Sequence, residues 1–351
     1  MKERLKSYSI VAVTLALLYI VLQQVGLVTL IETLRRAEPF WLCLSLGVSP
    51  FLVLVSVVRW QGLLISQGIL VALPRLCALY LVGRFFNNFL PSSIGGDLIR
   101  GYELSKVTKN GPEAVASIFM DRFTGFVVLV LFAAGAALTH LGVALDTGLM
   151  PAIVTAVIAL VSVIWLVLDS RPLVWVSRWT RFPWGQKYVA KLWSFHESVL
   201  AYRRRPRAVA IALGWSVVFM LLAIANVYTS GKAFDGSISV WDVTAIVPIV
   251  MLVAMLPLTI NGLGLQELAY VLLFPAFGVP ASVGLAAILL IRGKEAVLSI
   301  AGAILYPTIR ASVRAGINAG VGADGRVPKR AQGAEAHIET SRERTTACSG
   351  R

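Results

Sequence analysis

Long runs without a charged residue recur along this chain and predict its architecture. Each run contains about 20 or more mostly apolar residues, which is the length that one membrane-spanning helix requires. Between the runs the sequence turns polar or basic. The runs cover residues 7–31, 39–58, 123–145, 147–168, 208–231, 243–266 and 268–291, and the last continues after a short charged group to residue 309.

The cations between the runs predict the orientation. Residues 170–207 hold nine Lys or Arg and one acid, and the segment from residue 310 onward holds eight. Lys and Arg are enriched in cytoplasmic loops, so we expect both segments and the N-terminus to be cytoplasmic. The loop near Asp146 has no cation and is expected outside. These features predict a multi-pass protein of the cell inner (plasma) membrane with both termini cytoplasmic.

Two segments do not fit a simple span. Residues 60–113 must enter and leave on the same side, because Arg59 follows two crossings and the run 123–145 must start inside. Residues 241–280 include Pro248 and Pro257 and the closely spaced Gly262 and Gly264. Non-helical backbone at membrane depth must be buried in protein or line a cavity. Both segments therefore predict re-entrant or broken helix hairpins.

The predicted fold class is an all-α polytopic membrane protein with about six full spans and two re-entrant or broken hairpins. Each half has two spans, a broken hairpin and one more span, with opposite starting sides, which is the layout of an inverted repeat. Residues 90–97 and 256–262 share the spacing of Leu, Pro and Ile. We expect a membrane domain over 1–310, with repeats at about 5–145 and 147–309, and a disordered cytoplasmic tail over 311–351.

Composition supports this class and excludes others. Hydrophobic residues make up 57% and charged residues 14%, against about 25% charged in soluble domains. The net charge of +14 is explained by cytoplasmic loops, so nucleic acid is not an expected partner. The three cysteines and three histidines are scattered, and we expect no metal and no cofactor. Without a nucleophile motif or a nucleotide loop, no catalytic residue is expected.

The first candidate site lies in residues 84–100, which are rich in amides, hydroxyls, glycine and charge. Asp97 and Arg100 are three residues apart, so a helix places them on one face. They form either a ligand site or a structural ion pair. Asp121 and Arg122 open the apolar run that follows, and either anchor a span at the interface or pair with Asp97 or Arg100.

The second candidate site lies in residues 261–267, where glycines break an apolar stretch before Glu267. A helix starting there would present free N–H groups to an anion, or Glu267 would simply cap that helix. Further along, Lys294 and Glu295 could neutralise one another or extend their charged ends toward the membrane interface. Either arrangement would leave Arg292 as an unpaired charge in the last span, which is a functional candidate by default.

Together these segments predict a substrate-binding set without a catalytic or metal-binding member. The set is Asn87, Asn88, Pro91, Ser92, Gly95, Gly96, Asp97, Arg100, Asp121, Arg122, Asn261, Gly262, Gly264, Glu267 and Arg292.

These motifs resemble those of the lysylphosphatidylglycerol synthase transmembrane-domain family, the flippase-like UPF0104 membrane proteins. Residues 85–100 carry the long motif, residues 121–125 resemble its Asp-Arg-x-x-Gly, residues 262–267 its Gly-x-Gly-x-x-Glu, and Arg292 its late-span arginine. The resemblance covers about residues 5–310. It implies a lipid-handling protein, whereas the soluble aminoacyltransferase domain of the best-understood members has no counterpart in these 351 residues.

Three functions remain open at this point. The first is a flippase that translocates a phospholipid or a polyprenyl-linked anionic lipid, or assists its transfer. The second is a membrane-embedded transferase in lysyl-phosphatidylglycerol, glycolipid or other lipid synthesis, with Asp97 or Glu267 as general base. The third is an accessory subunit that recruits a separate transferase through residues 170–207, where tryptophans interleave with cations and suit anionic lipid headgroups.

Overall fold

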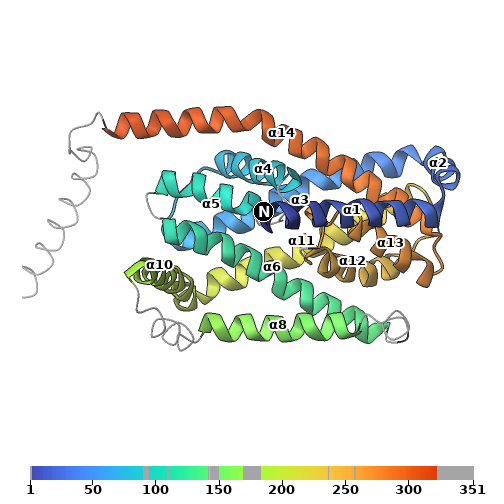
Figure 1. The fold of residues 1–351 in the computed structure, drawn as a ribbon, viewed down its shortest axis with the longest axis horizontal. Coiled ribbons are helices and arrows are strands. Elements are labelled where there is room, and N and C mark those ends of the chain that lie inside the picture. Colours follow the sequence, from blue (N-terminus) through green and yellow to red (C-terminus); the bar gives the residue numbers. More distant parts are fainter. Residues whose placement is uncertain are drawn as a thin grey trace, which may run out of the picture. The chain divides into compact units, whose positions relative to one another are not determined.

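The computed structural model describes residues 2–321, except residues 90–94, 109–110, 141, 143–149, 169–182, 236 and 257. Within this part of the chain all regular structure is helical (Figure 1). The chain divides into two units, Met1–Pro307 and Thr308–Arg351. Every contact discussed below lies within the first unit.

The helices follow one another with short connections. In chain order they are α1 (Lys2–Val25), α2 (Leu27–Arg35), α3 (Pro39–Ser66), α4 (Leu73–Phe89), α5 (Gly95–Thr108), α6 (Gly111–Thr139), α8 (Met150–Leu168), α10 (Pro183–Leu200), the 3₁₀ turn η1 (Ala201–Arg204), α11 (Pro206–Lys232), α12 (Val240–Ala254), the 3₁₀ turn η2 (Ile260–Gly262), α13 (Leu265–Ala276) and α14 (Ala281–Val321).

Three of these helices, α3, α6 and α11, are long and apolar enough to cross a membrane. The pair α1 and α2 makes a fourth candidate, although it is bent by 72°. The apolar run 7–31 was expected to form one continuous helix, and this expectation is wrong. The chain breaks at Gly26, whose φ of +78° is a left-handed conformation that glycine adopts without steric cost. The protein is a polytopic helical membrane protein, and six full spans and the inverted repeat remain predictions.

Several helices extend beyond the apolar runs that predict them. α3 continues to Ser66, and α6 begins at Gly111 rather than near residue 123. Asp121 therefore lies inside α6 and does not open it. The charges failed to mark helix ends because they are paired inside the bundle, as described below. α14 likewise continues to Val321, past the expected start of the tail at residue 311, and residues 322–351 lie outside the described part.

Helix pairs occupy both segments that were expected to be broken. α4 and α5 pack against each other in the first half, and α12 and α13 do so in the second. The basic segment 170–207 contributes α10, which packs against α6 and α8. α3 packs most extensively against α11, so helices from the two halves are in direct contact.

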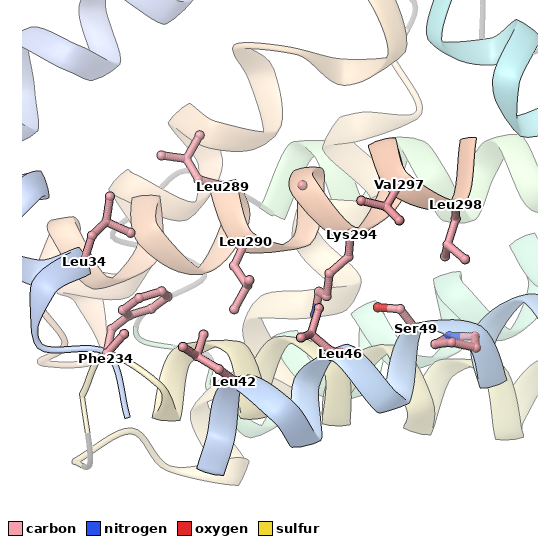
Figure 2. A pocket seen from close by; sticks show the side chains of 13 residues that line it. Leu34, Leu42, Leu46, Ser49, Phe234, Leu289, Leu290, Lys294, Val297 and Leu298 are labelled. Atoms are coloured by element: carbon pink, nitrogen blue, oxygen red, sulfur yellow. The ribbon is translucent and has the colours of Figure 1, made fainter. Parts of the chain in front are cut away.

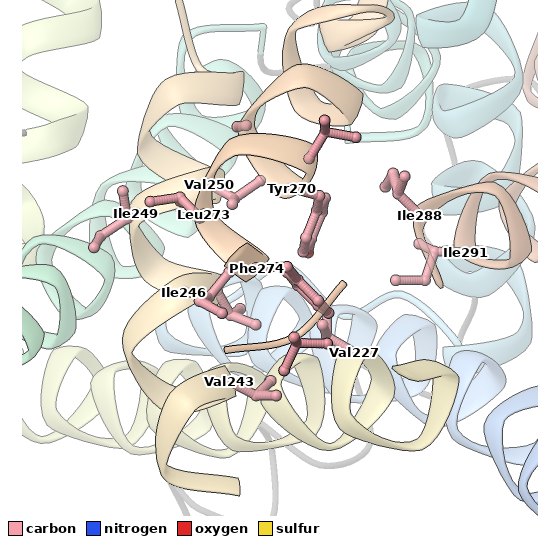
Figure 3. Packing of buried hydrophobic residues seen from close by; sticks show 14 of the residues in the cluster. Val227, Val243, Ile246, Ile249, Val250, Tyr270, Leu273, Phe274, Ile288 and Ile291 are labelled. Carbon is pink, nitrogen blue, oxygen red and sulfur yellow. The ribbon is translucent and has the colours of Figure 1, made fainter. Parts of the chain in front are cut away.

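The main apolar core surrounds the second helix pair. It contains side chains of α11, α12, α13 and α14, with Phe274 and Ile246 fully buried (Figure 3). Tyr270 and Phe274 on α13 lie edge to face, with ring centroids 5.6 Å apart. This packing holds α13 against α14 and thereby positions the start of α13, where Glu267 lies.

The predicted orientation can be tested by labelling single cysteines in a cysteine-free variant. Glu38→Cys, between α2 and α3, should react with a membrane-impermeant thiol reagent added outside intact cells. Arg204→Cys, in the basic segment, should react only after permeabilisation. Both positions are exposed in the folded chain, so burial does not account for a difference. The reverse pattern would contradict both the predicted orientation and the predicted opposite starting sides of the two halves.

Candidate functional site

Helix α4 carries two polar stripes, each with a different partner. Gly83 and Asn87 are four residues apart and face α5, whereas Arg84 and Asn88 face the second half of the chain. Residues at i and i+4 share a helix face, so one helix presents two separate sets of contacts. The candidate residues accordingly form two clusters, one on each side of α4.

The first cluster joins α3, α5 and α6 through five buried or partly buried charges. Asp97 accepts two bonds from Arg122, Nε to Oδ2 at 2.7 Å and Nη2 to Oδ1 at 3.0 Å, and a third from Arg100 at 3.1 Å. Asp121 accepts a 2.7 Å bond from Arg59 Nε and lies 3.8 Å from Arg100 Nη2. Three guanidinium groups thus face two carboxylates in this cluster.

Arg100 is the most enclosed cation of the first cluster, with its side chain 3% exposed. Its guanidinium lies 4.2 Å from the ring of Trp60 and 4.5 Å from that of Tyr80, so it is sandwiched between two π faces. Cation–π contacts of this kind are strongest where water is excluded. Gly83 makes room for this side chain, because a Cβ there would lie 2.5 Å from Arg100 Cδ.

The start of α5 touches the backbone of α4. The Gly96 N–H donates a 2.7 Å hydrogen bond to Asn87 Oδ1. A Cβ on Gly96 would overlap the carbonyl oxygen of Gly83. The two glycines therefore allow a backbone-to-backbone approach that no other residue pair permits.

The second cluster surrounds the start of α13. Glu267 accepts a 2.7 Å bond from the Gly264 N–H and a 2.9 Å bond from Arg292 Nε. Arg292 Nη1 also donates to the Asn261 carbonyl at 3.1 Å. The backbone bends sharply here, with positive φ at Asn261, Gly262 and Gly264. Glu267 therefore caps its own helix. Its carboxylate accepts the hydrogen bond of the Gly264 N–H, which could otherwise have faced an external anion.

Two expectations about the last span are wrong. Arg292 is not unpaired, since it binds Glu267. Lys294 and Glu295 do not neutralise each other: Glu295 binds Arg84 of α4 at 3.0 Å, while Lys294 points to α3 and α11. Successive residues on a helix point in different directions, so neighbours in sequence here serve different clusters.

A short link joins the two halves of the chain. Asn261 Nδ2 donates a 2.7 Å hydrogen bond to Asn88 Oδ1. The broken segments expected near residues 85–100 and 256–267 thus meet. The structure does not bring Arg292 together with Asp97 and Arg100, however, because Arg292 belongs to the second cluster.

The geometry constrains the possible chemistry. Asp97 and Glu267 were the two candidate general bases, and both are held by arginine. Neither carboxylate is left free to accept a proton from a substrate, which disfavours a transferase mechanism through them. Arg122 is different, because its side chain is 54% exposed although it binds Asp97. Arg122 is therefore the accessible member at the edge of the first cluster.

Sequence reasoning missed several members of these clusters. Arg59 follows an apolar run and was taken as its boundary, whereas it is buried against Asp121 and donates to Ser216 at 3.0 Å. Arg84 could have been found from its position four residues before Asn88. Of the predicted set, Pro91 and Ser92 lie outside the described residues. Gly95 begins α5, and Gly262 lies in η2.

Comparison with known proteins decides the family. The family model described as the lysylphosphatidylglycerol synthase TM region matches residues 8–302. The chain belongs to this family. It is also similar to UPF0104 membrane proteins of Pyrococcus horikoshii, with 24% identity over 82% of this chain and 92% of the relative, and of Methanocaldococcus jannaschii, with 23% identity over 82% and 90%. The clusters on either side of α4 both lie within the region matched by the family model.

Proposed function

We propose that this multi-pass membrane protein translocates an anionic phospholipid or polyprenyl-linked lipid across the plasma membrane. The observation that carries the proposal is the charge imbalance of the first cluster, with three arginines for two aspartates and Arg122 exposed at its edge. A charge at bilayer depth is costly unless it is paired or used. A phosphate headgroup would supply the missing negative charge.

The unsatisfied donors support an anionic substrate. In the described part of the chain, Arg292 Nη2 and Arg100 Nε are buried without a hydrogen-bond partner. Guanidinium groups bind phosphate oxygens through paired N–H donors. The broken segments of both halves meet beside Arg292, and transporters built from repeats bind their substrates where such segments meet.

A vesicle assay tests the proposal. The purified chain is reconstituted with fluorescent phosphatidylglycerol, and an impermeant reductant bleaches the outer leaflet. We expect faster loss of the inner-leaflet signal than in empty vesicles. Arg122→Gln should slow it about tenfold or more, because a hydrogen bond to a charged group contributes about 1.5–3 kcal/mol.

Arg207→Gln is the matched control, because Arg207 is an exposed arginine at the start of α11. It should translocate at the native rate. Equal rates for the native chain and for empty vesicles, with anionic and with zwitterionic lipids alike, would refute the proposed function.

A further inference from the structure

A wide apolar cavity lies between the end of α2, the first half of α3 and the middle of α14. Its volume is about 550 Å³, within the range of small-molecule sites, which is about 300–1,000 Å³. Leu34, Leu46 and Val297 line it and are themselves exposed, so the cavity is open at the protein surface. Such a surface within a membrane faces lipid chains.

Lys294 is the charged residue in the described lining of this cavity. Figure 2 shows its side chain crossing from α14 toward Leu46 and Ser49 of α3. It lies thirteen residues into α14, about 20 Å along the helix axis at 1.5 Å per residue. This depth is well inside the hydrocarbon region of a membrane that α14 enters near its first residue.

The described partners of the Lys294 ammonium are all neutral oxygens. They are Ser45 Oγ at 2.5 Å, Asn226 Oδ1 at 2.6 Å, Ser230 Oγ at 3.1 Å and the Ser45 carbonyl at 3.2 Å. These oxygens solvate the ammonium but do not cancel its charge. The arrangement differs from the two clusters beside α4, where every arginine has a carboxylate partner.

The Lys294 cluster adjoins a second cavity. This inner cavity of about 150 Å³ is lined by Asn226, a partner of Lys294, and by Arg84 and Glu295. Ser49 and Leu298 line both cavities. The inner space holds about five waters at roughly 30 Å³ each, which suits a phosphate group but not acyl chains.

We infer that the wide cavity binds one anionic phospholipid, with its acyl chains between α3 and α14 and its phosphate at Lys294. The apolar lining matches the chains. Lys294 is buried and its donors are taken by neutral oxygens, so its uncompensated charge, rather than a direct hydrogen bond, attracts the phosphate. This inference rests on the proposed function and adds a second lipid contact, separate from the first cluster at Arg122. It places the headgroup beside the inner cavity while the chains stay in the membrane.

Two variants test the site. Gly293 lines the cavity, and a Cβ there meets no heavy atom within 4 Å, so Gly293→Phe fills the cavity. Lys294→Gln removes the charge but keeps a hydrogen-bond donor. Gly135→Phe and Lys232→Gln are the matched controls, since Gly135 also has open space around its Cβ and both residues lie outside the described cavity linings.

The experiment uses the full chain in vesicles that contain phosphatidylglycerol or phosphatidylcholine with a photoreactive group on the acyl chain. Peptide mass spectrometry then locates the label. We expect labelling of α3 around residues 42–50 and of α14 around residues 289–298. Gly293→Phe should reduce it about tenfold, as expected for blocking a central contact. Lys294→Gln should abolish an approximately tenfold preference for phosphatidylglycerol.

The outcomes separate this inference from the proposed function. Labelling spread evenly over exposed helices, or labelling unchanged in Gly293→Phe, overturns the lipid site even if vesicles show translocation. A Lys294→Gln variant that keeps the preference for phosphatidylglycerol overturns the role of Lys294. Specific labelling in a protein that moves no lipid supports the site and refutes the proposed function. Each variant is first checked for monodisperse elution, and the control variants should match the native chain.

Discussion

Replacing Asp97 by asparagine should lower the free energy of unfolding by about 3–5 kcal/mol, the usual cost of removing one partner from a buried ion pair. Asp97 is buried and accepts hydrogen bonds from both Arg122 and Arg100. Its neutralisation leaves three arginines facing the single carboxylate of Asp121. Denaturant unfolding of the purified chain in detergent measures the loss.

A second substitution should restore the stability but not the activity. In Asp97→Asn combined with Arg122→Gln, the first cluster regains its original excess of one positive charge, and the unpaired guanidinium is gone. We expect most of the lost stability to return, while lipid translocation stays low because the exposed arginine is missing. Recovery of both would show that Arg122 serves only to hold Asp97.

Asp242→Asn is the control for this series. Asp242 lies in the first turn of α12, where an acid stabilises the helix by about 0.3–1 kcal/mol. An effect of Asp97→Asn as small as that of Asp242→Asn would contradict the buried network.

Gly96→Ala should abolish the folded protein or destabilise it by about 3 kcal/mol or more, at or above the upper range for overpacking. The added methyl group overlaps the Gly83 carbonyl oxygen, and backbone atoms cannot rotate away as a side chain can. The α4–α5 pair would have to separate, which breaks the Gly96 to Asn87 hydrogen bond as well. Yield of monodisperse protein and its thermal midpoint report the effect.

Gly62→Ala provides the comparison for this prediction. Gly62 lies inside α3, and a Cβ there meets no heavy atom within 4 Å. Alanine is favoured over glycine inside a helix by up to about 1 kcal/mol, so Gly62→Ala should be neutral or stabilising. Equal behaviour of the two variants would mean that α4 and α5 are not in close contact.

The sequence predicts features that depend on local spacing. The apolar runs predict α3, α6 and α11, and the glycines near residue 262 predict the break before α13. The three-residue spacing of Asp97 and Arg100 places them on one helix face, as either a ligand site or an ion pair, and the structure shows the ion pair at 3.1 Å. The Asp97–Arg100 pair lies within one helical turn, so the helix geometry alone determines this contact.

Contacts between distant helices could not be predicted in the same way. Arg59 and Asp121 are 62 residues apart, and nothing in either local sequence specifies how α3 and α6 are rotated about their axes. A charge at the edge of an apolar run was therefore taken as a helix end, although it was a buried partner. Lys294 and Glu295 were misassigned for the same reason, since their direction depends on what surrounds α14.

The two stripes of α4 make different kinds of contact, one through backbone atoms and the other through the ends of side chains. Gly83 meets Gly96 backbone to backbone, a contact with no adjustable atoms, so α4 and α5 must move as one rigid piece. Arg84 and Asn88 meet the second half through the ends of side chains, which can release one partner and take another by rotating about their χ angles. α14 also reaches the backbone of α4 directly, because a Cβ on Gly302 would overlap the Leu81 carbonyl oxygen. Asn88 meets η2 through side-chain amides, so this junction can change partner without moving α4 against α5 or α14.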